Sequence, residues 1–168
     1  MISTAAALAH LFDLVSPLPI EMVPLRHAAG RTLAQDLHAC RDQPPFAASA
    51  MDGYALRGTD VTAGATLRVI GEAAAGHRFD GTITAGTAAR IFTGAPLPRG
   101  ADRVIIQEDV SRHGDHITLH RDIDPARYIR PAGADFKTGD TLSAPRLISP
   151  SDVALIAAMN IAMVPVTR

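Results

Sequence analysis

Polar side chains able to take part in chemistry are concentrated in a few short segments. The first segment is the loop 44–56, PPFAASAMDGYAL, in which Asp52 is the only charged residue. A carboxylate in a partly buried apolar loop needs a cation, backbone amides or a hydroxyl as its partner, because burial without one is costly. The Asp52–Gly53 pair is also typical of a simple turn in which the carboxylate bonds to its own backbone. The local sequence alone favours that turn.

Two further segments offer an oxyanion site and a charged pair. In FTGAPLP, Thr93 supplies a hydroxyl and Gly94 lets the backbone approach a ligand closely, which suits an oxyanion. A strand that ends in a proline-stiffened turn explains the same residues. In RPAGAD, Arg130 and Asp135 flank a glycine-bearing bend. They are suited to binding a phosphate or a metal, and equally to forming a solvated ion pair on the surface.

Other motifs that would assign a function are weak or missing. The sequence has no Walker A lysine motif and no complete GxGxxG. His113, His116 and His120 are of a type that binds metals, so a free-standing metal site is one alternative. However, Gly114–Asp115 between two extended runs predicts a hairpin turn, and histidines beside such a turn more often face solvent.

The composition excludes several classes of function. The net charge is −1, which gives no long-range field toward DNA or an anionic membrane. Aromatic residues make up 4% and there is no Trp, so stacking platforms for nucleic-acid bases are not expected. Cys40 is the only cysteine, which fits a reducing cytoplasm. The N-terminus lacks the basic region of a signal peptide, and no segment approaches transmembrane length.

The elements that must position these segments can be predicted from their patterns. Apolar residues at helical spacing predict a first helix that begins near Ser3 and ends at Ser16–Pro17. A second helix follows Ser149 as N-cap, with Asp152 at the capping-box position, and a terminal strand follows it. From Tyr54 to Arg130, short apolar runs alternate with glycine-bearing turns, which predicts a β-rich segment built on a small aliphatic core.

In sequence order, the motifs resemble the N-terminal region of the family of MoeA-type molybdopterin molybdenumtransferases and gephyrin E-domains. The elements are VPLRHAAGRTLAQDL, PPFAASAMDGYAL, GTAARIFTGAPLPRGADRVIIQED, IRPAGADFKTGD and LISPSDVALIAAMNIAMVPV. Together they cover nearly the whole chain. The SAMDGYA and TGAPLP elements at this separation are highly specific.

The resemblance implies an enzyme that inserts molybdate into adenylylated molybdopterin and releases AMP, assisted by a divalent cation such as Mg²⁺. It assigns catalytic roles to Asp52, Thr93 and Asp135, with Asp52 and Asp135 also as metal ligands. Ser49 and Arg130 would contact the substrate. Where the family often has Gly-Glu-Asp, this chain has Gly-Ala-Asp ending at Asp135, which removes one carboxylate.

The fold implied by the resemblance is a β-rich α+β fold made of two subdomains. Residues 1–55 and 128–168 would form a discontinuous outer α+β subdomain, and residues 56–127 would form an inserted, glycine-punctuated β subdomain. The family's molybdopterin-binding domain and its C-terminal β domain would lie beyond Arg168. We therefore expect the chain to be inactive alone and to work as a cytoplasmic homodimer, without nucleic acid or membrane. The alternative is a non-catalytic dimerisation or partner-binding module of the same family.

Overall fold

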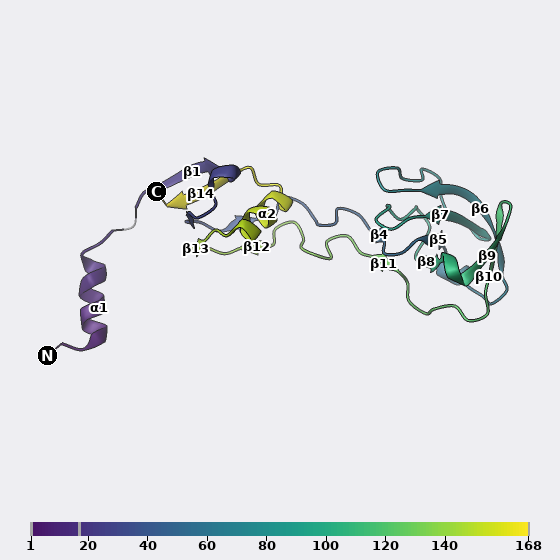
Figure 1. Cartoon of the computed structure of the whole chain (residues 1–168), viewed down its shortest axis with the longest axis horizontal. Helices are drawn as coiled ribbons and strands as arrows, with labels where there is room; N and C mark the ends of the chain where they lie inside the picture. Colours follow the sequence, from purple (N-terminus) through teal and green to yellow (C-terminus); the bar gives the residue numbers. More distant parts are fainter. Residues whose placement is uncertain (1, 17, 168) are drawn as a thin grey trace. The chain divides into compact units, whose positions relative to one another are not determined.

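The chain divides into two compact units. A computed structural model describes residues 2–16 and 18–167. Unit 1 consists of Met1–Arg41 with Lys137–Arg168, and unit 2 is Asp42–Phe136 (Figure 1). Unit 2 therefore begins earlier in the chain and ends later than the inserted subdomain that was predicted at residues 56–127. The reason is that the loop 44–56 pairs with segments of unit 2, as described below.

Unit 1 is built on two small antiparallel sheets. The first sheet has the strand order β1-β14-β2-β13, and the second pairs β12 with β3. The register of β1 and β14 runs from Ile20 opposite Thr167 to Pro24 opposite Met163. The predicted terminal strand is thus confirmed. The bounds are β1 Ile20–Pro24, β2 Thr32–Leu33, β3 Leu37–His38, β12 Thr141–Leu142, β13 Arg146–Leu147 and β14 Met163–Thr167.

The second helix of unit 1 begins as its sequence predicts. Helix α2 spans Pro150–Ala158, and Ser149 and Asp152 form the reciprocal capping box. Arg146 on β13 adds an ion pair of 2.8 Å to the Asp152 carboxylate. Helix α2 ends before Asn160, which has a φ of 63°. Ile156 is fully buried and anchors the helix to unit 1.

The first helix, α1, spans Thr4–Asp13 and has Ser3 as its N-cap, as predicted. None of its residues is buried. Leu8, Leu11 and Phe12 are each more than half exposed, so the helix presents an apolar surface. Among the residues that the structure describes, no helix is long and apolar enough to cross a membrane.

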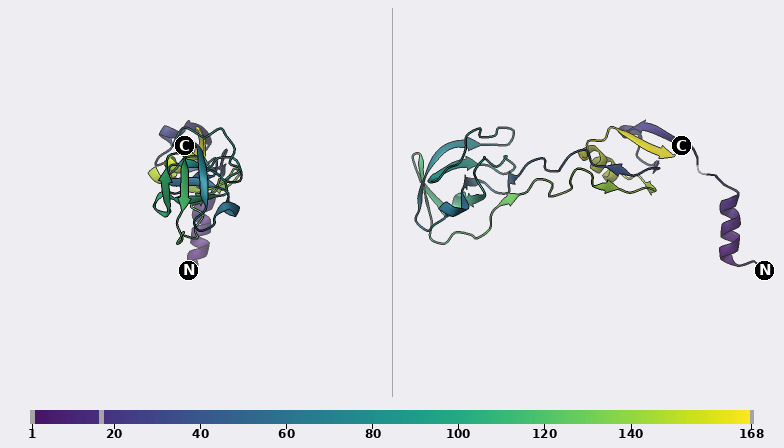
Figure 2. Two further views of the ribbon diagram at one scale, coloured as in Figure 1. Left: turned by 90° about the vertical axis from the view of Figure 1, so that its right-hand side faces the viewer. Right: turned by 180° about the vertical axis from the view of Figure 1, so that it is seen from behind.

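Unit 2 contains a six-stranded sheet with the order β8-β5-β7-β6-β10-β9. The views in Figure 2 show these strands gathered in one body from two further directions. Strands β6 and β7 are parallel and the other neighbours are antiparallel. A separate pair joins β4 to β11. The bounds are β4 Ala48–Ser49, β5 Gly53–Leu56, β6 Thr66–Ala73, β7 Thr87–Ile91, β8 Arg103–Ile106, β9 Val110–His113, β10 His116–Leu119 and β11 Ile129–Arg130.

Strand β5 is buried on both faces. Tyr54 and Leu56 belong to one apolar cluster and Ala55 belongs to a second. A side chain at Gly53 would place its Cβ 2.0 Å from the backbone oxygen of Ile105, so only glycine lets β5 approach β8 this closely. The prediction that residues 53–56 continue the loop is wrong: they form a central strand, because long-range pairing fixes them.

Short turns connect several of the strands. Gly114, with a φ of 62°, turns β9 into β10, so the predicted hairpin is confirmed. Short 3-10 turns lie at η1 Leu25–His27, η2 Gly58–Asp60 and η3 Gln107–Asp109. Between residues 32 and 39 the chain forms the two short strands β2 and β3.

Candidate functional site

The three segments singled out in the sequence lie together in unit 2. Ser49 donates its backbone N–H to the Ala95 oxygen at 3.0 Å and accepts the Gly94 N–H at 2.8 Å. On the other side, β4 pairs with β11, and the Ala50 N–H binds the Tyr128 oxygen at 2.9 Å. Backbone hydrogen bonds thus fix the loop 44–52 between the FTGAPLP and RPAGAD segments.

Asp52 and Thr93 form the best-defined polar contact of this region. One Asp52 oxygen, Oδ1, accepts both the backbone N–H and the hydroxyl of Thr93, each at 2.8 Å. The other oxygen, Oδ2, has no hydrogen bond among the described residues. The turn that the local sequence favoured for Asp52 is therefore wrong, because the carboxylate binds a residue 41 positions away rather than its own backbone.

The surroundings of Asp52 favour its charged form. The pKa of Asp52 is lowered, first by the Thr93 backbone N–H and next by the Thr93 hydroxyl; desolvation opposes these two bonds, and the positive charge of Arg90 lowers the pKa by the smallest amount. Asp52 is therefore an ionised carboxylate with a fixed orientation at neutral pH. Such a group suits binding a cation or positioning a donor.

Arg90 supports this site, although the sequence analysis did not single it out. Its guanidinium lies 4.7 Å from the Phe92 ring centre and 5.2 Å from that of Tyr54. It donates to the Gly53 backbone oxygen at 3.2 Å and to Gln107 Oε1 at 2.6 Å. The signal in the sequence was a charged residue within the otherwise apolar run that forms β7.

Ser49, Thr93 and Arg130 line one cavity of about 430 Å³. Ser49 is buried, and its hydroxyl donates to the Met51 backbone oxygen at 2.6 Å. That bond holds the loop in shape and leaves the hydroxyl less available to a ligand. The other lining residues are Gln43, Pro44, Pro45, Phe46, Ala48, Ala50 and Gly94.

Asp52 and Asp135 do not line this cavity themselves, but each binds a residue that does. Asp52 binds Thr93, and Asp135 forms an ion pair with Arg130. Both members of the second pair are partly exposed. The backbone of Asp135 is fixed through its N–H, which binds the Gln43 oxygen at 2.8 Å. The two predicted carboxylates therefore attach to two different walls of one cavity.

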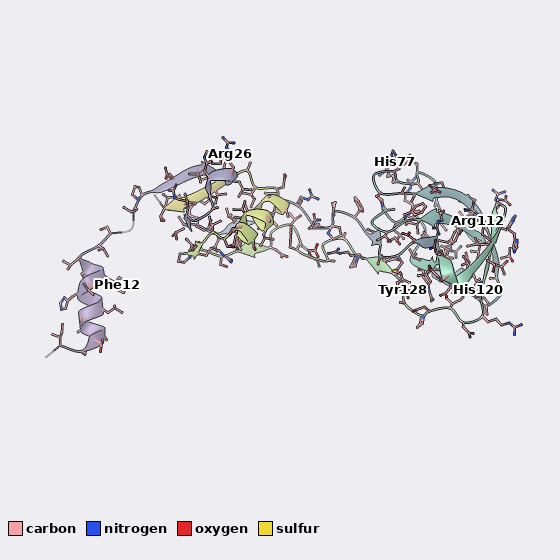
Figure 3. All side chains as sticks on the ribbon, in the orientation of Figure 1. Phe12, Arg26, His77, Arg112, His120 and Tyr128 are labelled. Atoms are coloured by element: carbon pink, nitrogen blue, oxygen red, sulfur yellow. The ribbon has the colours of Figure 1, made fainter. Side chains whose placement is uncertain are left out.

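A metal site made only by this chain is not supported. Within residues 2–16 and 18–167, no three His, Cys, Asp or Glu side chains gather closely enough to hold a metal ion. His116 binds Asp115 at 2.7 Å, and His120 binds the Ser111 hydroxyl at 3.0 Å on the β9–β10 hairpin (Figure 3). His113 and His116 face each other across that hairpin without a third ligand.

The profile of a known family matches nearly the whole chain. The family is described as the MoeA N-terminal region (domain I and II), and the match covers residues 2–160. The chain belongs to this family. The MoeA match includes all of unit 2 and most of unit 1, up to residue 160, and it confirms the resemblance drawn from the motifs.

Individual MoeA relatives agree in sequence and in fold. A molybdopterin molybdenumtransferase of Haemophilus influenzae is 38% identical over 156 residues, covering 92% of this chain and 39% of the relative. One of Synechococcus elongatus is 36% identical over 175 residues, covering 99% and 43%. A crystal structure of the molybdopterin biosynthesis moeA protein from Pyrococcus horikoshii OT3 matches with a TM-score of 0.88 and 38% identity. That match covers 99% of this chain and 46% of the other.

The predicted β-rich α+β fold of the MoeA N-terminal region is therefore confirmed. The chain spans about two fifths of the length of these curated relatives.

Proposed function

We propose that this chain acts as the N-terminal part of a molybdopterin molybdenumtransferase. The reaction would insert molybdate into adenylylated molybdopterin and release AMP, in the cytoplasm, as one step of molybdenum cofactor biosynthesis. The names of the relatives support the activity, and the observation that carries it to this chain is the Asp52–Thr93 contact beside the cavity that Ser49, Thr93 and Arg130 line.

In this proposal, Asp52 and Thr93 act as one unit. Thr93 holds Oδ1 of the carboxylate, so the free Oδ2 keeps a fixed direction and a full share of the negative charge. Arg130 supplies positive charge for the anionic substrate along the same cavity. Asp135 positions Arg130 through their ion pair.

The donor set fits a Mg²⁺ ion that is shared with the substrate. Mg²⁺ in proteins commonly uses one or two carboxylates and completes its shell with water and substrate phosphates. Asp52 Oδ2 would supply one protein oxygen, and Asp135 is the second predicted ligand, although one of its oxygens is held by Arg130. When bound, the cation would polarise the phosphoryl oxygens of the adenylylated substrate.

The test is complementation in a bacterium that lacks its own molybdopterin molybdenumtransferase. Residues 2–160 of this chain would replace the matching segment of the Haemophilus influenzae relative, and molybdoenzyme activity in the cells would be measured. We expect the chimera to restore activity and its Asp52→Ala variant to lose at least about tenfold, the loss of roughly one charge-assisted hydrogen bond.

Two controls keep this test decisive. The chain alone should give no activity, whereas turnover of adenylylated molybdopterin by the chain alone would refute the need for further domains. An Arg112→Ala chimera changes an exposed arginine on β9 and should behave like the parent. A fully active Asp52→Ala chimera would reduce Asp52 to a structural role.

A second candidate function is a non-catalytic dimerisation or partner-binding module. The apolar surface of α1 favours it, because Leu11, Phe12 and Leu14 are all more than 60% exposed. Light scattering on the chain and on a Leu11→Ser, Phe12→Ser double variant measures this directly. A dimer that the double variant loses would support the module, and a strictly monomeric chain would argue against it.

A further inference from the structure

Gln107 contacts the Asp52 backbone, and the proposed reaction assigns it no role. It is the first residue of η3, directly after β8. In the antiparallel pairing of β5 with β8, Gly53 lies opposite Ile106, so the next position along brings Asp52 opposite Gln107. The Gln107 backbone N–H accordingly donates to the Asp52 backbone oxygen at 3.1 Å. One hydrogen bond thus continues the strand pairing into the loop that carries Asp52.

The side chain of Gln107 is held by Arg90. Arg90 Nη2 donates to Gln107 Oε1 at 2.6 Å, and Nη1 donates to the Gly53 backbone oxygen at 3.2 Å. The Gln107 amide in turn donates from Nε2 to Glu108 Oε1 at 3.2 Å. The bond from the guanidinium is the stronger kind, because its donor is charged. One guanidinium thus ties Gln107 to the backbone of the residue next to Asp52.

The sheet fixes the guanidinium that makes these two bonds. Arg90 on β7 and Phe92 just after it point to the same side, since side chains two positions apart on a strand share a face. Tyr54 lies directly opposite Arg90 in the pairing of β5 with β7. The guanidinium carbon accordingly lies over both rings. Two rings and two acceptors hold one planar group, a combination that arginine can satisfy and lysine cannot.

These contacts determine where the Asp52 side chain begins. At its far end, Thr93 holds Oδ1 through two bonds of 2.8 Å. At its near end, Gln107 holds the backbone oxygen of the same residue. Aspartate has only two side-chain torsions, so fixing its backbone and one carboxylate oxygen also fixes the direction of Oδ2. A small shift of the backbone would therefore turn Oδ2 or break a bond to Thr93.

We propose that Gln107, held by Arg90, is a positioning residue for Asp52. It sets the direction of Oδ2 and does not line the cavity of Ser49 and Thr93 itself. Its effect on the rate rests on the proposed function, in which a misplacement of about 1 Å can cost about a hundredfold. Its coupling to the Asp52–Thr93 bonds is a property of the chain without substrate.

Two substitutions separate this role from packing. Gln107→Met keeps the length of the side chain and removes the acceptor for Arg90, whereas Gln107→Glu keeps an acceptor. Amide hydrogen exchange of the full chain is measured at Thr93, whose N–H binds Asp52 Oδ1. We expect Gln107→Met to speed this exchange about tenfold, the loss of roughly one charge-assisted hydrogen bond, and Gln107→Glu to stay near the parent rate. The Leu119 amide on β10 is the internal reference for an intact fold and should not change.

Arg90→Lys tests the same coupling from the other side. It keeps the positive charge but offers one nitrogen in place of the two that serve Gln107 and Gly53. We expect it to speed Thr93 exchange as Gln107→Met does. If Gln107→Met also alters the Leu119 reference, Arg90→Lys decides the question, and an unchanged Thr93 rate there would overturn the proposal.

Turnover is measured in the chimera that carries residues 2–160 of this chain in the Haemophilus influenzae relative. We expect Gln107→Met to lower kcat about tenfold and to change the KM for adenylylated molybdopterin less than about twofold, because the residues that line the cavity are unchanged. Gln107→Glu should recover most of the kcat. A residue that only supports the fold would not be rescued by keeping one acceptor oxygen.

Gln35→Met is the matched control, because it makes the same change at an exposed glutamine of unit 1. It should behave like the parent in both measurements. A Thr93 exchange rate in Gln107→Met equal to that in Gln35→Met would overturn the proposal. So would a Gln107→Glu variant as impaired as Gln107→Met, or an unchanged kcat of Gln107→Met in an active chimera. An inactive parent chimera would count against the proposed function alone, since the exchange experiment needs no substrate.

Discussion

At the scale of single residues, the Asp52 carboxylate is defined by the bonds it receives. Two donors of Thr93 converge on one oxygen, and both stabilise the ionised form more than the protonated form. Its folded-state pKa is therefore depressed. A depressed carboxyl pKa adds stability that is present above the unfolded value, about 3.9, and is lost as the pH falls through the folded value.

We predict that Thr93→Val raises the Asp52 pKa without returning it to the ordinary range. The hydroxyl bond is lost, but the Thr93 backbone N–H, which has the larger effect, remains. Carbon-detected NMR titration of the carboxyl carbons measures the shift. Asp124 is an internal control, since its lowered pKa depends on Tyr128 and Ala126 and should not move. If the pKa of Asp52 were the same in the variant and the parent, the bond from the Thr93 hydroxyl would not form in solution.

Gly53 provides a second prediction at this scale. Alanine there would press its Cβ against the Ile105 backbone oxygen in the middle of the sheet, and backbone cannot give way as a side chain can. We expect Gly53→Ala to lower the free energy of unfolding by about 3 kcal/mol or more, at the upper end of overpacking costs.

Gly64→Ala is the control for Gly53→Ala. Gly64 has a φ of 77° and open space around it, so alanine there should cost only the roughly 1–2 kcal/mol of the left-handed backbone. Both values come from chemical denaturation of the two variants beside the parent. Equal losses at the two positions would contradict the close approach of β5 and β8.

At the scale of elements, α2 is fixed at its start by side chains close in sequence. The Asp152 carboxylate accepts the backbone N–H of Ser149 at 2.9 Å and its hydroxyl at 2.7 Å, and pairs with Arg146. The pKa of Asp152 is lowered first by the Ser149 backbone N–H, next by the Ser149 hydroxyl, and least by the charge of Arg146, whereas desolvation opposes them. The cap thus depends on the ionised form.

Asp152→Asn should therefore destabilise the chain in a pH-dependent way. We expect a loss of about 1 kcal/mol in the free energy of unfolding at pH 7, as for other N-terminal caps. The difference should begin to shrink as the pH falls below about 4, the pKa of an unfolded Asp, and should vanish only as the pH falls through the lowered folded pKa of Asp152. Urea denaturation at several pH values measures it. A loss that stays constant from pH 7 to pH 3 would show that the charge plays no part.

Elements with local signals were predictable, and those fixed by distant contacts were not. The caps of α1 and α2 and the Gly114 hairpin follow from adjacent residues. Strand β5 was missed because its pairing with β7 and β8 lies far away in sequence. The same holds for the site: the sequence named Asp52 and Thr93, but their bond became visible only in the fold.

At the scale of the whole molecule, unit 2 is an insertion whose two ends meet. Gln43 donates its backbone N–H to the Phe136 oxygen at 2.9 Å. In unit 1, Ala39 likewise binds the Asp140 oxygen at 2.9 Å. Each unit thus closes its own chain ends, and unit 2 keeps both of its apolar clusters. Such a unit has what it needs to fold independently.

We predict that a polypeptide of residues 42–136 folds alone. It should unfold cooperatively and keep the β-sheet signal of unit 2 in circular dichroism, because its sheet and clusters need no residue of unit 1. Hydrogen exchange would locate the most protected amides in β5 and β7. A polypeptide that stays unfolded in native buffer would show that unit 2 depends on unit 1.

The pairing of β1 with β14 also decides how the protein responds to force. Ile20 lies opposite Thr167, so the two ends of the folded chain leave the sheet at the same point. A pull on both termini therefore loads the hydrogen bonds of this pair one at a time, as in opening a zipper, and not all together in shear. Unit 2 lies outside the path of that load until the pair has opened. Under such a pull, the sheet that contains β1 and β14 should therefore open first, before the candidate site of unit 2 is disturbed.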